Sequence, residues 1–348
     1  VEELKNIDKE ILQMIDDFNV IEKDGTVLIP DCALNGMDMP FYVNHSTSPN
    51  LKKIDASGNY SIIESSIKKF GFEPEHNLHY FMNNEEPKTK NAIIDFGDSA
   101  IMLTNFGKDC ARLFPSGILG PRKVHARMML DFFNYSFKNK KTSEILAEIS
   151  EDDYEEFKKI IPKNICLADA PYIYYWPIVN LKEFDMELKG SRFYELRKIK
   201  NSFMKKNRIE FHDAKYIEKG ILKEVLHQWE KSRKGKDDAI SHEYNRWLET
   251  NFLGADYAKC AYVNGFPSAI LCGWNIPNSS SFYLAVVLHN YMASNIGEIL
   301  YLECFKELKS MGFGYCNLGG SDENLLKFKK KFLPEMLYKT VEFSVKRA

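Results

Sequence analysis

The chain has 348 residues, of which 44% are hydrophobic and 28% are charged. This composition is typical of a folded globular protein and argues against a disordered or fibrous chain, and the length favours two domains. The formal net charge of −2 indicates neither a nucleic-acid nor a membrane partner. However, residues from Leu181 onward have a net charge of +6 and the first 180 residues a net charge of −8. An anionic partner is therefore expected to bind the second half.

The cysteines and the chain start indicate the compartment. The seven cysteines are scattered and never spaced C-x-x-C, so we expect neither a disulfide framework nor a cysteine zinc site. The chain opens with an acidic amphipathic helix that lacks the basic start and apolar run of a signal peptide. No window approaches the roughly 18 apolar residues that a transmembrane helix needs. We therefore expect a cytoplasmic protein without a metal site or a membrane-spanning segment.

The first half is predicted to alternate strands and helices after a poorly patterned start. Residues 20–60 are rich in Gly, Pro, Asn and Ser and allow no assignment. Residues 92–106 predict two strands about a Gly-Asp turn, followed by a third strand over 110–119. The period of the hydrophobic residues then predicts helix 122–137, strand 142–150, helix 151–161 and a final strand region over 165–179.

The end of the second half has the same order of strands and helices as the first half. After a helix over 190–206, we expect a strand, two helices, three meandering strands, and then helix, strand, helix and strand. Strands that meander and then alternate with helices favour a mixed, mostly antiparallel sheet flanked by helices, an α/β (α+β) fold. We interpret the chain as two related domains, residues 1–180 and 181–348. The predicted elements of the second half are 209–214, 219–233, 242–253, 257–263, 268–276, 281–289, 296–312, 313–321, 324–334 and 337–346.

Three segments carry a resemblance to a known family. They are ELKGSRFYELRKIKNSFMKKN (187–207), YCNLGGS (315–321) and LLKFKKKFLP (325–334). With the element order, they resemble the GNAT acyltransferase superfamily, and more narrowly the tandem-GNAT soluble domain of lysylphosphatidylglycerol synthases. The first segment is also similar to the basic stretch of FemX-like aminoacyltransferases. The resemblance is detailed over 181–348 and only architectural before it, which implies a degenerate first domain and an active site in the second.

The resemblance implies where a donor would bind. In GNAT enzymes the pantetheine of acyl-CoA lies between the fourth and fifth strands, and its pyrophosphate contacts N–H groups at the start of the next helix. Here this implies cofactor contacts from Asn290, Asn295 and Gly297, although the usual glycine-rich loop is weak. Gly319, Gly320 and Ser321 would add N–H donors, or alternatively form a turn that needs positive φ. We expect acyl-CoA or aminoacyl-tRNA as donor and no tightly bound cofactor.

Three residues are candidates for catalysis. Tyr283 lies on the fourth strand, where alternation allows it to face the gap or to be buried. His289, at the end of that strand, is either a general base or a structural histidine. Many GNAT enzymes place a tyrosine acid where this chain has Phe328 and Lys329. With that acid missing, the chemistry is expected to differ, as in relatives that use an aminoacyl-tRNA ester.

A basic stretch over 189–208 is the candidate anion-binding segment. It contains eight cations and one acid. Arg197, Asn201 and Lys205 fall four residues apart on one helix face and, with Arg192, would hold an anionic portion of the substrate. The alternative is a solvated helix face. A second cationic cluster, Lys327 to Lys331, follows the double glycine.

These observations lead to two hypotheses about function. The first is an acyl or aminoacyl transferase that moves the acyl group from a thioester or a tRNA ester to an amine or hydroxyl. The alternative is a non-catalytic tandem GNAT-fold module that binds tRNA or another polyanion. Peripheral contact with anionic lipid stays open because the second half is basic.

Overall fold

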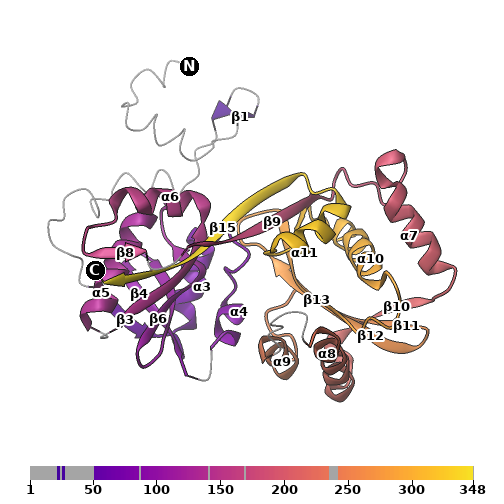
Figure 1. Ribbon diagram of the computed structural model, residues 1–348, viewed down its shortest axis with the longest axis horizontal. Coiled ribbons are helices and arrows are strands. Elements are labelled where there is room, and N and C mark those ends of the chain that lie inside the picture. The colour runs from indigo at the N-terminus through magenta and orange to yellow at the C-terminus, as the bar shows by residue number, and fades with distance from the viewer. Residues whose placement is uncertain are drawn as a thin grey trace. The chain divides into compact units, whose positions relative to one another are not determined.

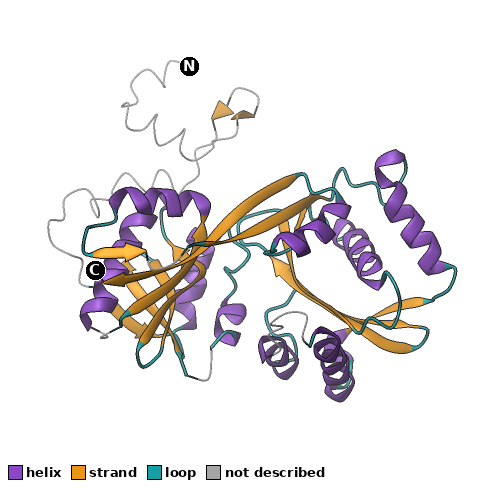
Figure 2. Cartoon of the chain, in the orientation of Figure 1, coloured by secondary structure: helices purple, strands orange, loops and turns teal. Residues whose placement is uncertain are grey.

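A computed structural model of the chain describes residues 22–23, 26–27, 51–85, 88–139, 142–167, 170–234 and 242–347. The chain divides into two compact units, Val1–Pro49 and Asn50–Ala348. In the first unit, β1 (Glu22–Lys23) pairs antiparallel with β2 (Thr26–Val27). The helix predicted at the chain start lies outside the described residues. Figure 1 shows the elements of the second unit and Figure 2 their type of secondary structure.

One mixed sheet of 13 strands runs through the described part of the second unit. Its strand order is β10-β11-β12-β13-β14-β9-β15-β7-β6-β5-β4-β3, with β8 pairing β15. Pairing is antiparallel except between β6 and β7 and between β13 and β14, so the predicted mixed, mostly antiparallel sheet is confirmed. The strands are β3 (Lys52–Asp55), β4 (Lys90–Gly97), β5 (Ala100–Phe106), β6 (Cys110–Leu119), β7 (Glu144–Ser150), β8 (Ile165–Leu167), β9 (Tyr172–Asn180), β10 (Ile209–Asp213), β11 (Tyr257–Val263), β12 (Phe266–Asn275), β13 (Ser281–His289), β14 (Tyr315–Asn317) and β15 (Met336–Arg347).

Helices cover both faces of the sheet in the second half. Hydrophobic residues of α7 and α10 share one core cluster with one face of β11–β13, and residues of α8 and α9 share another cluster with the opposite face. Both clusters follow from amphipathic sequences that bury a single stripe. The helices are α3 (Tyr60–Phe70), α4 (Leu78–Asn83), α5 (His125–Asn139), α6 (Glu151–Ile160), α7 (Tyr194–Met204), α8 (Lys219–Arg233), α9 (His242–Glu249), α10 (Ile296–Ser310) and α11 (Glu323–Lys329).

The predicted elements after residue 90 are present, with local differences. The helix predicted over 190–206 begins as a 3₁₀ turn, Ser191–Phe193, before α7. The strand region predicted over 165–179 is divided into β8 and β9. Gly312 has φ +94°, so it ends α10 in the left-handed conformation that glycine adopts without strain.

Two long strands connect the halves of the sheet. Residues 172–178 of β9 pair with residues 336–342 of β15, and the end of β9 pairs with β14 of the second half. The later residues of β15 pair with β7 of the first half. Figure 1 shows both strands passing from one half to the other. The boundary expected near residue 180 stays a prediction, because backbone pairing is continuous across it.

A segment before β4 is also bound to the second half. We call Gly71–Asn83 the bridging segment. Four hydrogen bonds hold this segment in a fixed position between the halves, and three of them are accepted by its own main-chain carbonyls. The four hydrogen bonds are Asn278 Nδ2 to Gly71 O (2.7 Å), Trp274 Nε1 to Pro74 O (2.7 Å), Arg246 Nη1 to Asn83 O (2.9 Å) and Asn77 Nδ2 to Gly254 O (3.0 Å).

Candidate active site where two strands diverge

The parallel strands β13 and β14 stay paired for three residues only. Pairing runs from Ser281 opposite Tyr315 to Tyr283 opposite Asn317. Beyond this point β13 continues to His289, whereas β14 ends and the chain turns at Gly319, which has φ +86°. We call the divergence of β13 from β14 the fork. Along it, within the described residues, one edge of β13 has backbone groups without a partner strand.

Several of the predicted residues meet where the fork begins. Lys329, on α11, is 3% exposed, and its Nζ donates to the carbonyl of Gly319 at 3.0 Å. A Cβ added to Gly319 would lie 3.4 Å from Tyr283 Cε2 and 3.6 Å from Lys329 Nζ. Ser321 Oγ donates to the same carbonyl at 3.1 Å. The structure therefore brings Tyr283, Lys329 and the double glycine together.

The buried Lys329 amine has an unusual acidity. Burial lowers the pKa of Lys329 to about 7, partly offset by Asp322 and Cys316. Burial raises the pKa of the neighbouring Tyr283 well above its usual value. Near neutral pH the Lys329 amine thus exists in both protonation states, so it can give or accept a proton at this place.

A β-bulge lies just beyond the start of the fork. Gly273 of β12 pairs with Leu284, and the next residue, Cys272, pairs with Val286, so Ala285 is left out of the register. Bulges are frequent next to active sites because they redirect backbone groups. Ala285 was not predicted from the sequence. The signal for it was Gly273, a glycine inside a predicted strand.

His289 lies at the far end of β13 from Tyr283. Six residues of strand separate the two positions, which corresponds to roughly 20 Å. The His289 ring contacts Tyr291 with 4.1 Å between centroids, and its buried Nδ1 has no hydrogen-bond partner. Burial lowers the pKa of His289 to about 4, so the ring is neutral at pH 7 and only a weak base.

The start of α10 is poorly suited to a pyrophosphate. Asn295 precedes the helix with φ 64° and makes no side-chain cap, while Asn290 Nδ2 donates to Gln228 Oε1 at 3.0 Å. Glu298, buried in the first turn, pairs with Lys331 at 2.6 Å. A carboxylate at this end opposes a second anion. Gly297 lies against His289, where an added Cβ would be 3.3 Å from Nε2.

The same arrangement of strands and helices occurs in solved structures. The C-terminal domain (DUF2156) of a protein named as a lysylphosphatidylglycerol synthetase, from Agrobacterium fabrum, aligns with 83% of this chain and 92% of its own (TM-score 0.60, 12% identity). A tandem GNAT protein from the clavulanic acid biosynthesis pathway aligns with 85% of this chain and 98% of its own (TM-score 0.52, 10% identity). The chain has a GNAT-like fold.

FemX has this fold too, and it aligns with 83% of the present chain and 96% of its own (TM-score 0.56, 11% identity). No protein-family model and no curated protein matches the sequence. Identities of 10–12% show a GNAT-like fold and not a particular activity.

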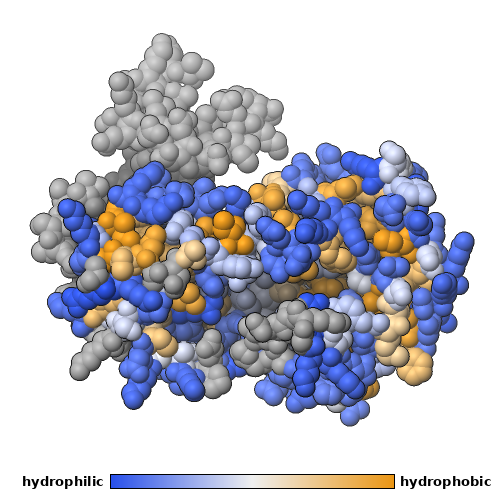
Figure 3. Space-filling model, viewed as in Figure 1, coloured by the Kyte–Doolittle hydropathy of each residue, from blue (hydrophilic) through white to orange (hydrophobic). Residues whose placement is uncertain are grey.

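The basic stretch lies in the second half of the chain and includes α7. Arg197 Nη1 donates to the carbonyls of Leu188 and Gly190, so this guanidinium holds its own loop. The Arg192 guanidinium lies 4.8 Å from the Phe193 ring centroid. Asn201 and Lys205 are exposed, and Figure 3 shows hydrophilic residues along the outer side of α7. The anion-binding role of these four residues stays a prediction.

Two matched substitutions distinguish a structural role of Arg197 from the exposed position of Lys205. Arg197→Ala is expected to lower the free energy of unfolding by about 1–3 kcal/mol, because two carbonyls lose a charged donor. Lys205→Ala is expected to change it by less than about 0.5 kcal/mol, because the side chain is exposed. Urea unfolding measures both. Equal losses would contradict the structural role of Arg197.

The first GNAT-like half has a fork of its own, with acidic surroundings. The parallel strands β6 and β7 pair from Cys110–Glu144 to Arg112–Leu146 and then diverge. A small cavity beside them is lined by Glu73, Asp153 and six other residues. Burial, with Asp153 nearby, raises the pKa of Glu73 to about 8. The degenerate character of the first domain stays a prediction.

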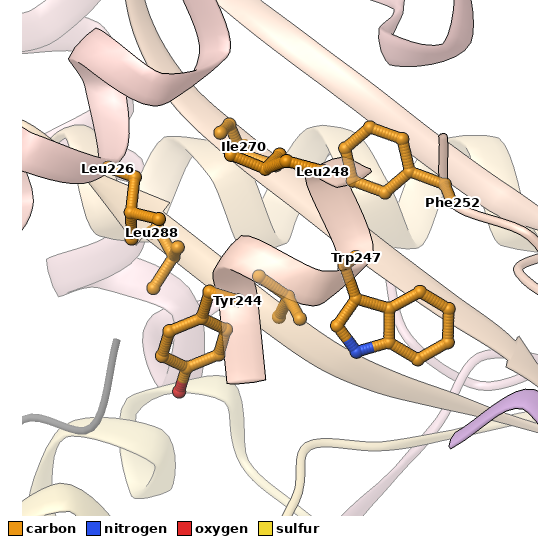
Figure 4. Close-up of a pocket in the computed structure, with 8 residues that line it drawn as sticks. Leu226, Tyr244, Trp247, Leu248, Phe252, Ile270 and Leu288 are labelled. Carbon is orange, nitrogen blue, oxygen red and sulfur yellow. The ribbon is translucent and has the colours of Figure 1, made fainter. Parts of the chain in front are cut away.

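A second small cavity lies between α8, α9 and the sheet. Its lining is almost wholly apolar, and the Tyr244 hydroxyl points away from the other residues (Figure 4). Without polar groups to orient a ligand, it has the character of imperfect core packing. The lining residues are Leu226, Tyr244, Trp247, Leu248, Phe252, Ile270, Val286 and Leu288.

Two further properties concern the described residues only. None of their helices is both long enough and apolar enough to cross a membrane. Among the same residues, no three or more His, Cys, Asp or Glu side chains are grouped so that they could hold a metal ion.

Proposed function

We propose that the protein transfers an acyl or aminoacyl group from a thioester or ester donor to an amine or hydroxyl acceptor. The observation that supports this most is the convergence of Tyr283, Lys329 and the Gly319 main chain where β13 and β14 diverge. An extended acyl donor can lie along the unpaired edge of β13, and its carbonyl would then be close to these groups. The known structures with this fold agree with an acyltransferase.

The proposed reaction needs no covalent enzyme intermediate. The acceptor nitrogen or oxygen forms a bond to the donor carbonyl carbon, the acceptor loses a proton, and the bond to the leaving sulfur or oxygen breaks. Unpaired N–H groups of β13 near Ala285 would stabilise the negative charge that develops on the carbonyl oxygen. Lys329, with a pKa near 7, would give a proton to the leaving group, the role of the tyrosine that this chain lacks.

The surroundings of the fork favour an ester over a CoA thioester. A CoA donor requires an anion site at the start of α10, where Glu298 lies buried and Asn295 replaces a glycine-rich loop. An aminoacyl ester donor needs no anion site at the start of α10. Exposed lysines on α7 and at its C-terminal end, Lys198 and Lys205 among them, would then contact the phosphates of the tRNA.

The test is a transfer assay with both classes of donor. The purified protein is incubated with radiolabelled acetyl-CoA, or with tRNA charged with a mixture of labelled amino acids, and a mixture of small amines and alcohols as acceptors. We expect labelled product with charged tRNA. Mass spectrometry of the protein as purified shows whether CoA or RNA is bound. Absence of product with either donor contradicts the proposal.

The alternative function, a non-catalytic module for tRNA or another polyanion, is favoured by the exposed cations of α7. Affinity for uncharged tRNA is then expected to fall steeply with salt concentration and to decrease with Lys198→Ala and Lys205→Ala. Salt-dependent binding without any transfer would favour this alternative.

A further inference from the structure

The bridging segment places one carboxylate between the halves of the sheet. The carbonyl of Pro74 accepts a hydrogen bond of 2.7 Å from the Trp274 indole. His76 Nδ1 accepts from the backbone N–H of Glu73, so its Nε2 carries the proton and donates to Ser116 O at 2.7 Å. Glu75 is thus fixed between a ring of the second half and β6 of the first.

The Glu75 side chain is buried without a full set of partners. It is 2% exposed, and its Oε2 has no hydrogen-bond partner. The charges that affect it most are two further carboxylates, Glu148 and Glu73. Glu148 is itself buried and accepts a 2.7 Å hydrogen bond from Thr340. A buried carboxylate beside two others is unfavourable in isolation and favours a cation as its partner.

Aromatic rings surround the same place. The Trp274 ring, which binds Pro74, lies 5.0 Å from Tyr283 and 5.1 Å from Tyr80 between centroids. Trp176 extends this group, because its ring lies 6.0 Å from Tyr283 and stacks on Tyr338 at 5.6 Å between centroids. Burial is the main cause of the raised pKa values of Tyr80, Tyr283 and Tyr338, and the charge of Glu75 adds to each. Ring faces and a carboxylate together are the groups that recognise an alkylammonium.

We propose that Glu75, supported by Glu148 and by the rings of Tyr80, Tyr283 and Tyr338, binds an ammonium group of the substrate. Tyr283 belongs both to this cluster and to the start of the fork, so the ammonium would lie next to the transferred carbonyl. That this ammonium group belongs to a substrate rests on the proposed function. Binding of an amine at Glu75 does not, because it is measurable without transfer. The ligand class is a primary alkylammonium compound.

The proposal predicts a proton release on binding. Burial, with Glu148 and Glu73 nearby, raises the pKa of Glu75 well above its usual value, which favours the protonated form of the free carboxyl. An ammonium beside it favours the ionised form and displaces that proton. Affinity is therefore expected to rise with pH while the amine stays protonated. The groups that act on the Glu75 carboxyl are Glu148, Glu73 and the Ser116 side chain, and the charge of Glu75 in turn acts on Tyr80, Tyr283 and Tyr338.

The experiment uses the full chain and two probes of equal size. n-Butylammonium and n-butanol are titrated while tryptophan fluorescence is recorded, because Trp274 lies beside the cluster. We expect saturable binding of butylammonium at pH 7.5, at least tenfold weaker binding at pH 6, and no saturable change with butanol. Glu75→Gln should weaken butylammonium binding at least tenfold, and the exposed Glu64→Gln control should not change it.

The outcomes distinguish this inference from the proposed function. Equal binding of butanol and butylammonium, or full affinity in Glu75→Gln, overturns the ammonium site even if transfer is observed. Binding that depends on Glu75 without any transfer overturns the proposed function and leaves the site intact. Because Glu75→Gln removes a buried acid, we expect it to fold, which thermal unfolding checks. Glu148→Gln is the second variant and should weaken binding about threefold.

Discussion

The Lys329→Met variant is expected to be more stable than the wild type at pH 7 and to lose this advantage as the pH rises. The wild type binds the Lys329 proton with a pKa of about 7, against 10.5 for an ordinary lysine. Between these values the unfolded chain holds more protons, so wild-type stability increases by up to about 1.4 kcal/mol per pH unit. Below pH 7 Lys329 is protonated in both the folded and the unfolded state, so the full free-energy cost of burying its charge remains. Urea unfolding from pH 6 to 9 measures the difference between the two proteins.

The comparison with the variant isolates this one group. Buried tyrosines and cysteines with raised pKa values affect both proteins alike, so their contribution cancels. A difference in stability that stays constant over this pH range would contradict an uncharged Lys329 in the folded state. Transfer activity is expected to fall at least 100-fold in Lys329→Met. Lys327→Met, exposed on the same helix, should keep the activity.

Gly273→Ala is expected to lower the free energy of unfolding by about 3 kcal/mol or more. An added Cβ would lie 2.2 Å from the Tyr283 carbonyl oxygen and 2.5 Å from Phe282 Cε1. The first contact is with backbone, so β12 and β13 must separate at the bulge where the fork begins. Thermal and urea unfolding give the loss, and transfer activity should fall with it because Tyr283 is displaced.

A second glycine provides the matched control. Gly220 lies inside α8, and the nearest atom to an added Cβ is a Glu218 carboxylate oxygen at 3.5 Å. Gly220→Ala is therefore expected to raise the free energy of unfolding by about 0.5–1 kcal/mol, because alanine loses less entropy in a helix. A loss below 1 kcal/mol for Gly273→Ala would show that the strands adapt to the methyl group.

Local patterns were sufficient to predict most elements of the second half. The strands over 257–263 and 281–289 alternate or run apolar between short turns, and α8 and α10 bury residues at helical spacing. These signals arise within a few neighbouring residues, so one sequence contains them. The bridging segment was not predicted, because its short helix and turns are held by side chains from the other half.

In the candidate site, too, some features were predicted from the sequence and others depend on contacts between distant residues. Tyr283, Lys329 and Gly319 were proposed one by one from resemblance and residue type, and the structure places them side by side. Arg197 was expected to hold a substrate anion, but its guanidinium binds two carbonyls of its own loop. Donor and acceptor distances decide such roles, and sequence spacing does not contain them.

The uneven charge of the chain is a property of the sequence alone, and so is the order of strands and helices that places the basic residues in the second half. Which of those cations are exposed, and where β13 leaves β14, depend on contacts between residues far apart in the chain. Contacts between distant residues also decide that β9 and β15 pass from one half of the sheet to the other and that Glu75 is buried between the halves. Backbone pairing and burial are cooperative properties of the whole sheet, so only the tertiary structure determines them.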